Sequence, residues 1–132
     1  MDLFAHLSLG LETVFQPINL LFCFLGVFLG TAIGVLPGIG PLGTIAILLP
    51  VTFGFPPEAS LIMLAGIYYG AQYGGSTTAI LINLPGEASS AVTAIDGYQL
   101  ARQGKAGTAL ALAAIGSFIA GCFATLLIAI FA

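Results

Sequence analysis

Side chains that could hold a polar ligand are concentrated in one stretch of this chain, residues 69–87. The stretch reads YGAQYGGSTTAILINLPGE and combines four glycines with a Ser-Thr-Thr triplet at 76–78, Asn83 and Glu87. A segment that only crossed or lined a membrane would not need these residues, because glycine and proline weaken helices and unpaired polar groups are costly in hydrocarbon. We therefore expect this stretch to hold something polar.

The helices that position this stretch are expected to lie in a membrane. The chain has 132 residues, of which 59% are hydrophobic and 5% charged, and its mean hydropathy is +1.15. Residues 18–36 and 108–132 contain no charged side chain, and about twenty apolar residues are enough to cross a bilayer as a helix. The composition therefore predicts a protein of the lipid bilayer, with short Gly- and Pro-rich segments between its helices.

Two function classes are disfavoured by the charged and reactive residues. The formal net charge is −3 and only two residues are basic, so nucleic acid is not an expected partner. A single histidine and two isolated cysteines, Cys23 and Cys122, form no readable nucleophile–base pair, so we expect no enzyme. A phosphate-cradling GxxxxGK[ST] motif is also missing from the sequence, which argues against an ATP-driven mechanism in this chain.

The pattern predicts an all-α membrane protein whose helices are interrupted by glycine and proline. Gly26, Gly30 and Gly34 recur every four residues, which places small residues on one helix face and lets another helix approach closely. The expected elements are a spanning helix at 17–36, a half-helix at 41–53, a helix at 57–73, a half-helix at 76–85, a polar loop at 86–107 with a short helix near 98–103, and a spanning helix at 108–132. A complete but kinked span over 41–53 is the structural alternative.

Each of the two expected half-helices follows a glycine-rich break. In PGIGPLG, residues 37–43, Gly38 and Gly40 permit positive φ. The second break is Gly74-Gly75, after which Ser76 is placed as the N-cap of the next piece. Helices that begin at such breaks present free N–H groups and the positive end of the helix dipole.

Several segments together closely resemble the large membrane subunit of tripartite tricarboxylate transporters, the TctA family. They are GVLPGIGP at 34–41, YYGAQYGGSTTAIL at 68–81, Asn83, PGE at 85–87, DGY at 96–98 and ARQG at 101–104. The resemblance extends over the chain from about residue 17 onward. Gln99 departs from the proline that often follows Asp-Gly-Tyr in the family, and the family's subunit is several times longer, so this chain resembles its N-terminal portion.

This resemblance implies a multi-pass protein of the bacterial inner membrane that is one part of an inverted-repeat secondary transporter. The implied partners are a small membrane subunit and a periplasmic solute-binding protein that delivers a carboxylate such as citrate. Symport with Na⁺ or H⁺ is also implied, without any bound cofactor. Arg102 and Lys105 favour a cytoplasmic position for the loop 86–107 by the positive-inside rule.

In secondary transporters, half-helix N-termini commonly bind anionic groups, and unwound carbonyls bind cations. We therefore expect the carboxylate to bind N–H groups at the two breaks, aided by the triplet's hydroxyls. The predicted substrate-binding residues are Gly38, Gly40, Gly74, Gly75, Ser76, Thr77, Thr78 and Asn83, and Asn83 and Thr78 are possible cation ligands.

Other interpretations of the same residues stay open. The three hydroxyls could serve capping and helix–helix hydrogen bonding, and the chain could be a non-transporting assembly or scaffold subunit. A channel is a further alternative, although no ring of charge is visible in the sequence. Glu87 could pair with Arg102 or Lys105 or could couple a cation, and we favour the first; Asp96 is left open.

Overall fold

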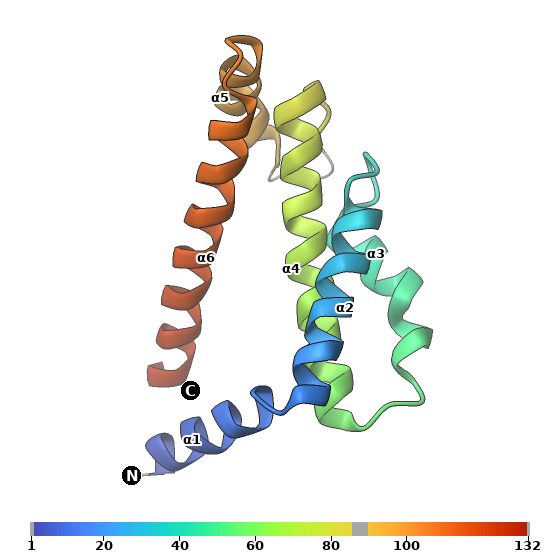
Figure 1. The fold of residues 1–132 in the computed structure, drawn as a ribbon, viewed down its shortest axis with the longest axis vertical. Helices are drawn as coiled ribbons and strands as arrows, with labels where there is room; N and C mark the ends of the chain where they lie inside the picture. The colour runs from blue at the N-terminus through green and yellow to red at the C-terminus, as the bar shows by residue number, and fades with distance from the viewer. Residues whose placement is uncertain (1, 86–89, 132) are drawn as a thin grey trace.

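The computed structural model describes residues 2–85 and 90–131, and every regular element in these ranges is a helix (Figure 1). This confirms the all-α prediction. The elements are α1 (Asp2–Val14), α2 (Pro17–Gly34), α3 (Gly40–Leu48), the 3₁₀ helix η1 (Leu49–Thr52), α4 (Pro57–Ile82), α5 (Ser90–Arg102) and α6 (Ala106–Phe131).

Helices α2 and α4 run parallel and form the centre of the fold, with their backbones in close contact. A Cβ atom added to Gly74 would lie 2.7 Å from the carbonyl oxygen of Thr31 and 2.8 Å from the amide nitrogen of Val35. Similar approaches occur along the whole interface, at Gly26, Gly30 and Gly34 of α2 and at Gly66 and Gly70 of α4. The prediction that the glycine face of residues 26–34 serves helix packing is therefore confirmed.

The connection between α2 and α4 returns through a short helical segment. After α2 ends, Gly38 and Gly40 adopt φ angles of 89° and 70°, as predicted for this break. Helix α3 has 9 residues and η1 has 4, so α3 spans only about 14 Å. Thr44 is fully buried, and its hydroxyl donates to the carbonyl oxygen of Gly40 at 2.8 Å.

The predicted break at Gly74-Gly75 is wrong. Helix α4 continues for 26 residues through both glycines, so the expected helix at 57–73 and half-helix at 76–85 are one element. Each glycine costs a helix about 1 kcal/mol relative to alanine, but both glycines are buried. Packing of α4 against α2 outweighs that cost, because only glycine lets the two backbones come so close.

The helix in the segment 86–107 is also longer than predicted. Instead of a loop with a short helix near 98–103, residues 90–102 form α5, which packs against α4 and α6. A Cβ atom on Gly97 would lie 2.6 Å from Cγ1 of Ile80, so α5 sits tightly on α4. Glu87, whose role was left open above, lies outside the described residues.

Two helices of the described chain, α2 and α6, are long and apolar enough to cross a membrane. Helix α6 runs antiparallel to α4 and stands apart from it over most of its length (Figure 1). Only Ala109 of α6 is buried, and its large apolar side chains are exposed along the helix. Such a surface suits contact with lipid or with other membrane helices rather than with water.

Candidate functional site

The two glycine-rich segments that the sequence singled out meet where α2 ends. The Thr78 hydroxyl lies 2.5 Å from the carbonyl oxygen of Val35 and donates a hydrogen bond to it. It also lies 3.2 Å from the carbonyl oxygen of Gly74, and Thr78 is only 3% exposed. The residue thus fixes the start of the turn at 35–39 against α4.

The turn leads into the N-terminus of α3, which has no side-chain cap. The N-cap position is occupied by Ile39, which has no side-chain acceptor, and no cap hydrogen bond is formed there. Because the first N–H groups of a helix have no acceptor within it, amides at this end of α3 can donate to a ligand. Pro41 has no N–H to satisfy. This end of α3 can therefore receive the negative charge of a carboxylate.

Ser76 and Thr77 occupy the interior of α4 and not a helix start. Their backbone N–H groups lie within a continuous helix, so the prediction that Ser76 caps a helix is wrong, and free N–H donors are not formed at Gly74 or Gly75. The Thr77 hydroxyl donates to the carbonyl oxygen of Tyr73 at 2.9 Å. Ser76 is half-buried and faces a cavity on another side of α4.

Asn83 ends α4 in the left-handed conformation, with φ of 59°. Its backbone N–H donates to the carbonyl oxygen of Ala79 at 3.1 Å, and the residue is exposed. Asparagine is one of the few residues that tolerate this conformation, which commonly follows the last turn of a helix. The side chain of Asn83 therefore lies beside the negative end of the α4 dipole, where a cation is favoured.

A cavity of about 440 Å³ lies between α4, α5 and α6 and contains polar groups from all three helices. Its polar side chains are Ser76, Thr93, Asp96 and Ser117. The sequence analysis missed Thr93 and Ser117. The only local signal is that Thr93 lies three residues before Asp96, a spacing that puts both on one face of a helix.

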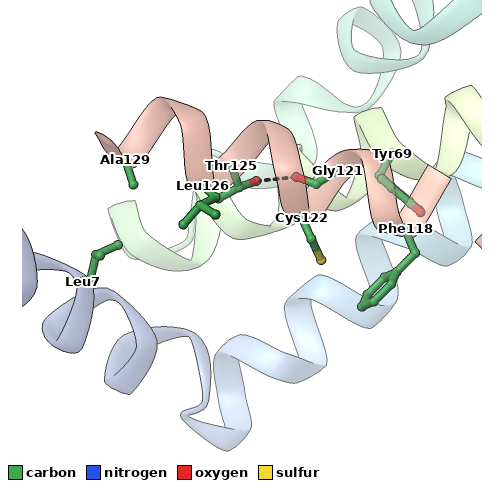
Figure 2. Close-up of a pocket in the computed structure, with 8 residues that line it drawn as sticks. All are labelled: Leu7, Tyr69, Phe118, Gly121, Cys122, Thr125, Leu126 and Ala129. Carbon is green, nitrogen blue, oxygen red and sulfur yellow. Dashed lines mark hydrogen bonds between the residues drawn. The ribbon is translucent and has the colours of Figure 1, made fainter. Parts of the chain in front are cut away.

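A second cavity, of about 490 Å³, is apolar and is shown in Figure 2. The Thr125 hydroxyl at its wall is used within α6, donating to the carbonyl oxygen of Gly121 at 2.8 Å. A carboxylate would find no paired charge here, so the cavity does not suit an anionic substrate. Its lining comes from α1, α4 and α6: Leu7, Tyr69, Phe118, Gly121, Cys122, Thr125, Leu126 and Ala129.

Comparison with known proteins identifies the family. Residues 20–132 match the model of the tripartite tricarboxylate transporter TctA family. An uncharacterized 52.8 kDa protein from the TAR-I ttuC' 3' region of Agrobacterium vitis is 74% identical over 130 residues, which are 98% of this chain and 26% of that protein. The chain thus spans about a quarter of the length of this relative.

No solved structure matches this chain. The family match covers most of the sequence and includes both segments that meet at Thr78. The chain therefore belongs to the tripartite tricarboxylate transporter TctA family.

Proposed function

We propose that this chain forms part of the membrane component of a binding-protein-dependent secondary transporter for tricarboxylates or related carboxylates. The observation that carries the proposal is the N-terminus of α3, which has no side-chain cap. It begins at Gly40, two residues after Gly38, both glycines have positive φ, and Thr78 holds the preceding turn beside α4. Family membership supports the same function.

In this proposal the substrate carboxylate accepts hydrogen bonds from the amides of Ile39, Gly40 and Leu42. Gly38 and Gly40 contribute by their backbone conformation, with φ of 89° and 70°. Charge-assisted hydrogen bonds of this kind are stronger than neutral ones and need no buried Lys or Arg. The site therefore holds an anion without placing a full positive charge in the membrane.

The α4 residues of the proposed site have supporting roles. Gly74 and Gly75 let α2 and α4 approach closely, and this approach sets the position of the turn at 35–39. Thr78 holds that turn, whereas the Thr77 hydroxyl is bonded to Tyr73 within α4 and Ser76 faces a cavity on another side of the helix. Asn83, five residues after Thr78, is proposed together with it to favour the coupling cation, Na⁺ or H⁺, at the C-terminus of α4.

The complete transporter in this proposal is a multi-pass protein of the bacterial inner membrane. It works with a small membrane subunit and with a periplasmic solute-binding protein that delivers citrate or a similar carboxylate. Because the chain spans 26% of its relative, a further part of the transporter would supply an inverted counterpart of these helices and the other half of the site. Residues 103–105, after α5, are assigned to the cytoplasmic side.

The test uses two glycines that share a backbone conformation but differ in position. Gly38, with φ of 89°, and Gly104, with φ of 81°, each have nothing within 4 Å of an added Cβ atom. Gly38→Ala strains the turn before α3, and we expect it to raise the KM for labelled citrate about ten-fold in proteoliposomes that contain the full complex. Gly104→Ala applies the same strain outside the site and should leave the KM near that of the unmodified transporter.

A scaffold role is the second candidate, because Thr77 and Thr78 both donate their hydroxyls to backbone carbonyls. A scaffold predicts that Gly38→Ala and Gly104→Ala behave alike in uptake, provided that both proteins are present at normal abundance. Equal KM values for these two variants would overturn the proposed carboxylate site.

A further inference from the structure

We propose that helix α1 lies along the lipid–water interface of the membrane, with one apolar face among the lipid acyl chains. Helices α2 and α6 are long and apolar enough to cross a membrane. Helix α1 runs crosswise to both, at the end where α2 begins and α6 ends (Figure 1). A helix in that position lies parallel to the membrane surface and at the depth of the interface. The partner of its exposed apolar face is therefore a lipid leaflet.

The apolar side chains of α1 are gathered on the side that faces the spanning helices. Leu7 points from α1 toward Leu126 and Ala129, near the end of α6 (Figure 2). Residues three or four positions apart share one face of a helix. Counted in such steps from Leu7, this face also carries Leu3, Phe4, Leu11 and Val14. The apolar face of α1 therefore points toward the membrane interior.

The polar side chains of α1 lie away from this face. They are His6, Glu12 and Thr13, at one, five and six positions from Leu7. Leu9 is the large apolar side chain that departs from the pattern, and it lines a cavity with Leu61 and Ile62 of α4. Helix α1 thus has the two unlike sides that a helix needs at the boundary between lipid and water.

The apolar face is left uncovered by the described part of the chain. Phe4 is 74% exposed and Leu11 is 58% exposed. The chain elements that adjoin α1 also carry exposed apolar side chains, with Ile18 at the start of α2 and Leu126 near the end of α6. Removing large apolar side chains from water is favourable, so the lipid that surrounds α2 and α6 can cover α1 as well.

A buried asparagine at the corner between α1 and α2 fixes the direction of α1. Asn19 is 4% exposed, and its Nδ2 atom donates to the carbonyl oxygen of Thr13 at 2.6 Å. Thr13 lies in the last turn of α1, where carbonyl groups have no partner within the helix. Because Asn19 belongs to the first turn of α2, this bond joins the end of one helix to the start of the other.

The charges of α1 do not favour attachment through anionic lipid headgroups. Residues 1–16 contain two carboxylates, Asp2 and Glu12, and no Lys or Arg. Basic side chains are what draw interfacial helices to anionic lipids. Helix α1 is therefore held by its apolar area and by its junction with α2, and its depth should not depend on the anionic lipid content.

The test uses full-length protein in liposomes, with the introduced cysteine as its only cysteine. A spin label on Leu11→Cys reports on the apolar face, and one on Glu12→Cys, the matched control, reports on the polar side. The depth of each label follows from its accessibility to oxygen, which concentrates in lipid, and to a water-soluble nickel chelate. We expect the label at position 11 about 5–10 Å inside the headgroup–acyl boundary and the label at position 12 on the water side.

Lipid contact predicts high oxygen and low nickel accessibility at position 11, the reverse at position 12, and equal depths in phosphatidylcholine with and without phosphatidylglycerol. Nickel access at position 11 would place the face in water, and low access to both reagents would show that protein covers it. Either result overturns the proposal, as does a depth that increases with phosphatidylglycerol content. Carboxylate uptake is not measured, so failure of the proposed transport function leaves this result unchanged.

Discussion

At the scale of single residues, Thr78 connects two segments that lie 43 positions apart. Its hydroxyl is shared between the carbonyl oxygens of Val35 and Gly74, at 2.5 Å and 3.2 Å. The Val35 carbonyl lies just beyond α2, where helix carbonyls have no partner within the helix. The donor Thr78 is buried, where a hydrogen bond is stronger than in water, so this hydroxyl stabilises the turn that precedes α3.

Replacing Thr78 by valine should show the size of this contribution. Thr78→Val preserves the branched shape and removes the donor, so we expect a loss of about 1–3 kcal/mol in the free energy of unfolding. Thr78→Ser retains the hydroxyl and should lose less. Thermal unfolding of the two purified variants measures the difference, and equal Tm values would show that the hydrogen bond to Val35 contributes nothing.

The sequence predicted some of these residue-level features and missed others for a clear reason. Positive φ at Gly38 and Gly40 follows from local chemistry, because glycine alone adopts it freely and prolines on both sides restrict the chain. The bond from Thr78 to Val35 depends on how α2 lies against α4. A contact at that separation leaves no local pattern, and the same is true of Thr93 and Ser117 at the α4–α5–α6 cavity.

At the scale of elements, the structure differs most from the sequence prediction at α4, which is one continuous helix. Local propensity at Gly74-Gly75 predicts a helix break, and the structure has a helix through both residues. The same period of four that correctly predicted a packing face on α2 is present on α4 at Gly66, Gly70 and Gly74. When two parallel helices both carry glycines at every fourth residue, the glycines indicate close helix packing. Packing therefore explains the glycines of α4 without a helix break.

The α2–α4 interface makes a direct prediction about glycine substitutions. A Cβ atom on Gly30 would lie 2.8 Å from Cα of Ile67, which is backbone and cannot rotate away. Gly30→Ala should therefore separate the helices and destabilise the protein by about 1–3 kcal/mol or more.

Gly116→Ala is the matched control for Gly30→Ala, because nothing lies within 4 Å of its added Cβ atom. That change should be neutral or should stabilise α6 by up to about 1 kcal/mol, since alanine favours a helix. The comparison is made by thermal unfolding in detergent. A Gly30→Ala protein as stable as Gly116→Ala would contradict the close packing of α2 on α4.

At the scale of the whole molecule, the chain has two distinct ends. Helices α2 and α4 begin at the same end, near α1, and α5 lies at the opposite end (Figure 1). Helix α6 then returns toward α1.

The composition predicted a membrane protein and the approximate bounds of α2 and α6, since long apolar runs are strong signals. The sequence leaves two possibilities for the return through α3 and η1, because prolines at 41 and 50 fit both a half-helix and a kinked span.

We propose that the two ends of this arrangement face opposite sides of the membrane. Arg102 and Lys105 lie at the α5 end, so the positive-inside rule favours a cytoplasmic position for that end in the proposed orientation. The connection between η1 and α4, residues 53–56, lies at the other end (Figure 1) and would face the periplasm in this proposed orientation. The α3 N-terminus then follows an α2 that runs from the periplasmic toward the cytoplasmic side.

Cysteine labelling tests this orientation. With Cys23 and Cys122 replaced by alanine, Gly54→Cys and Gln103→Cys each introduce one exposed thiol. A membrane-impermeant maleimide should label Gly54→Cys in intact spheroplasts and Gln103→Cys only in inside-out vesicles. The reverse pattern would invert the orientation and leave the fold intact. Labelling of both thiols from the same side would contradict the fold itself, because η1–α4 and α5–α6 would then lie on one face of the membrane.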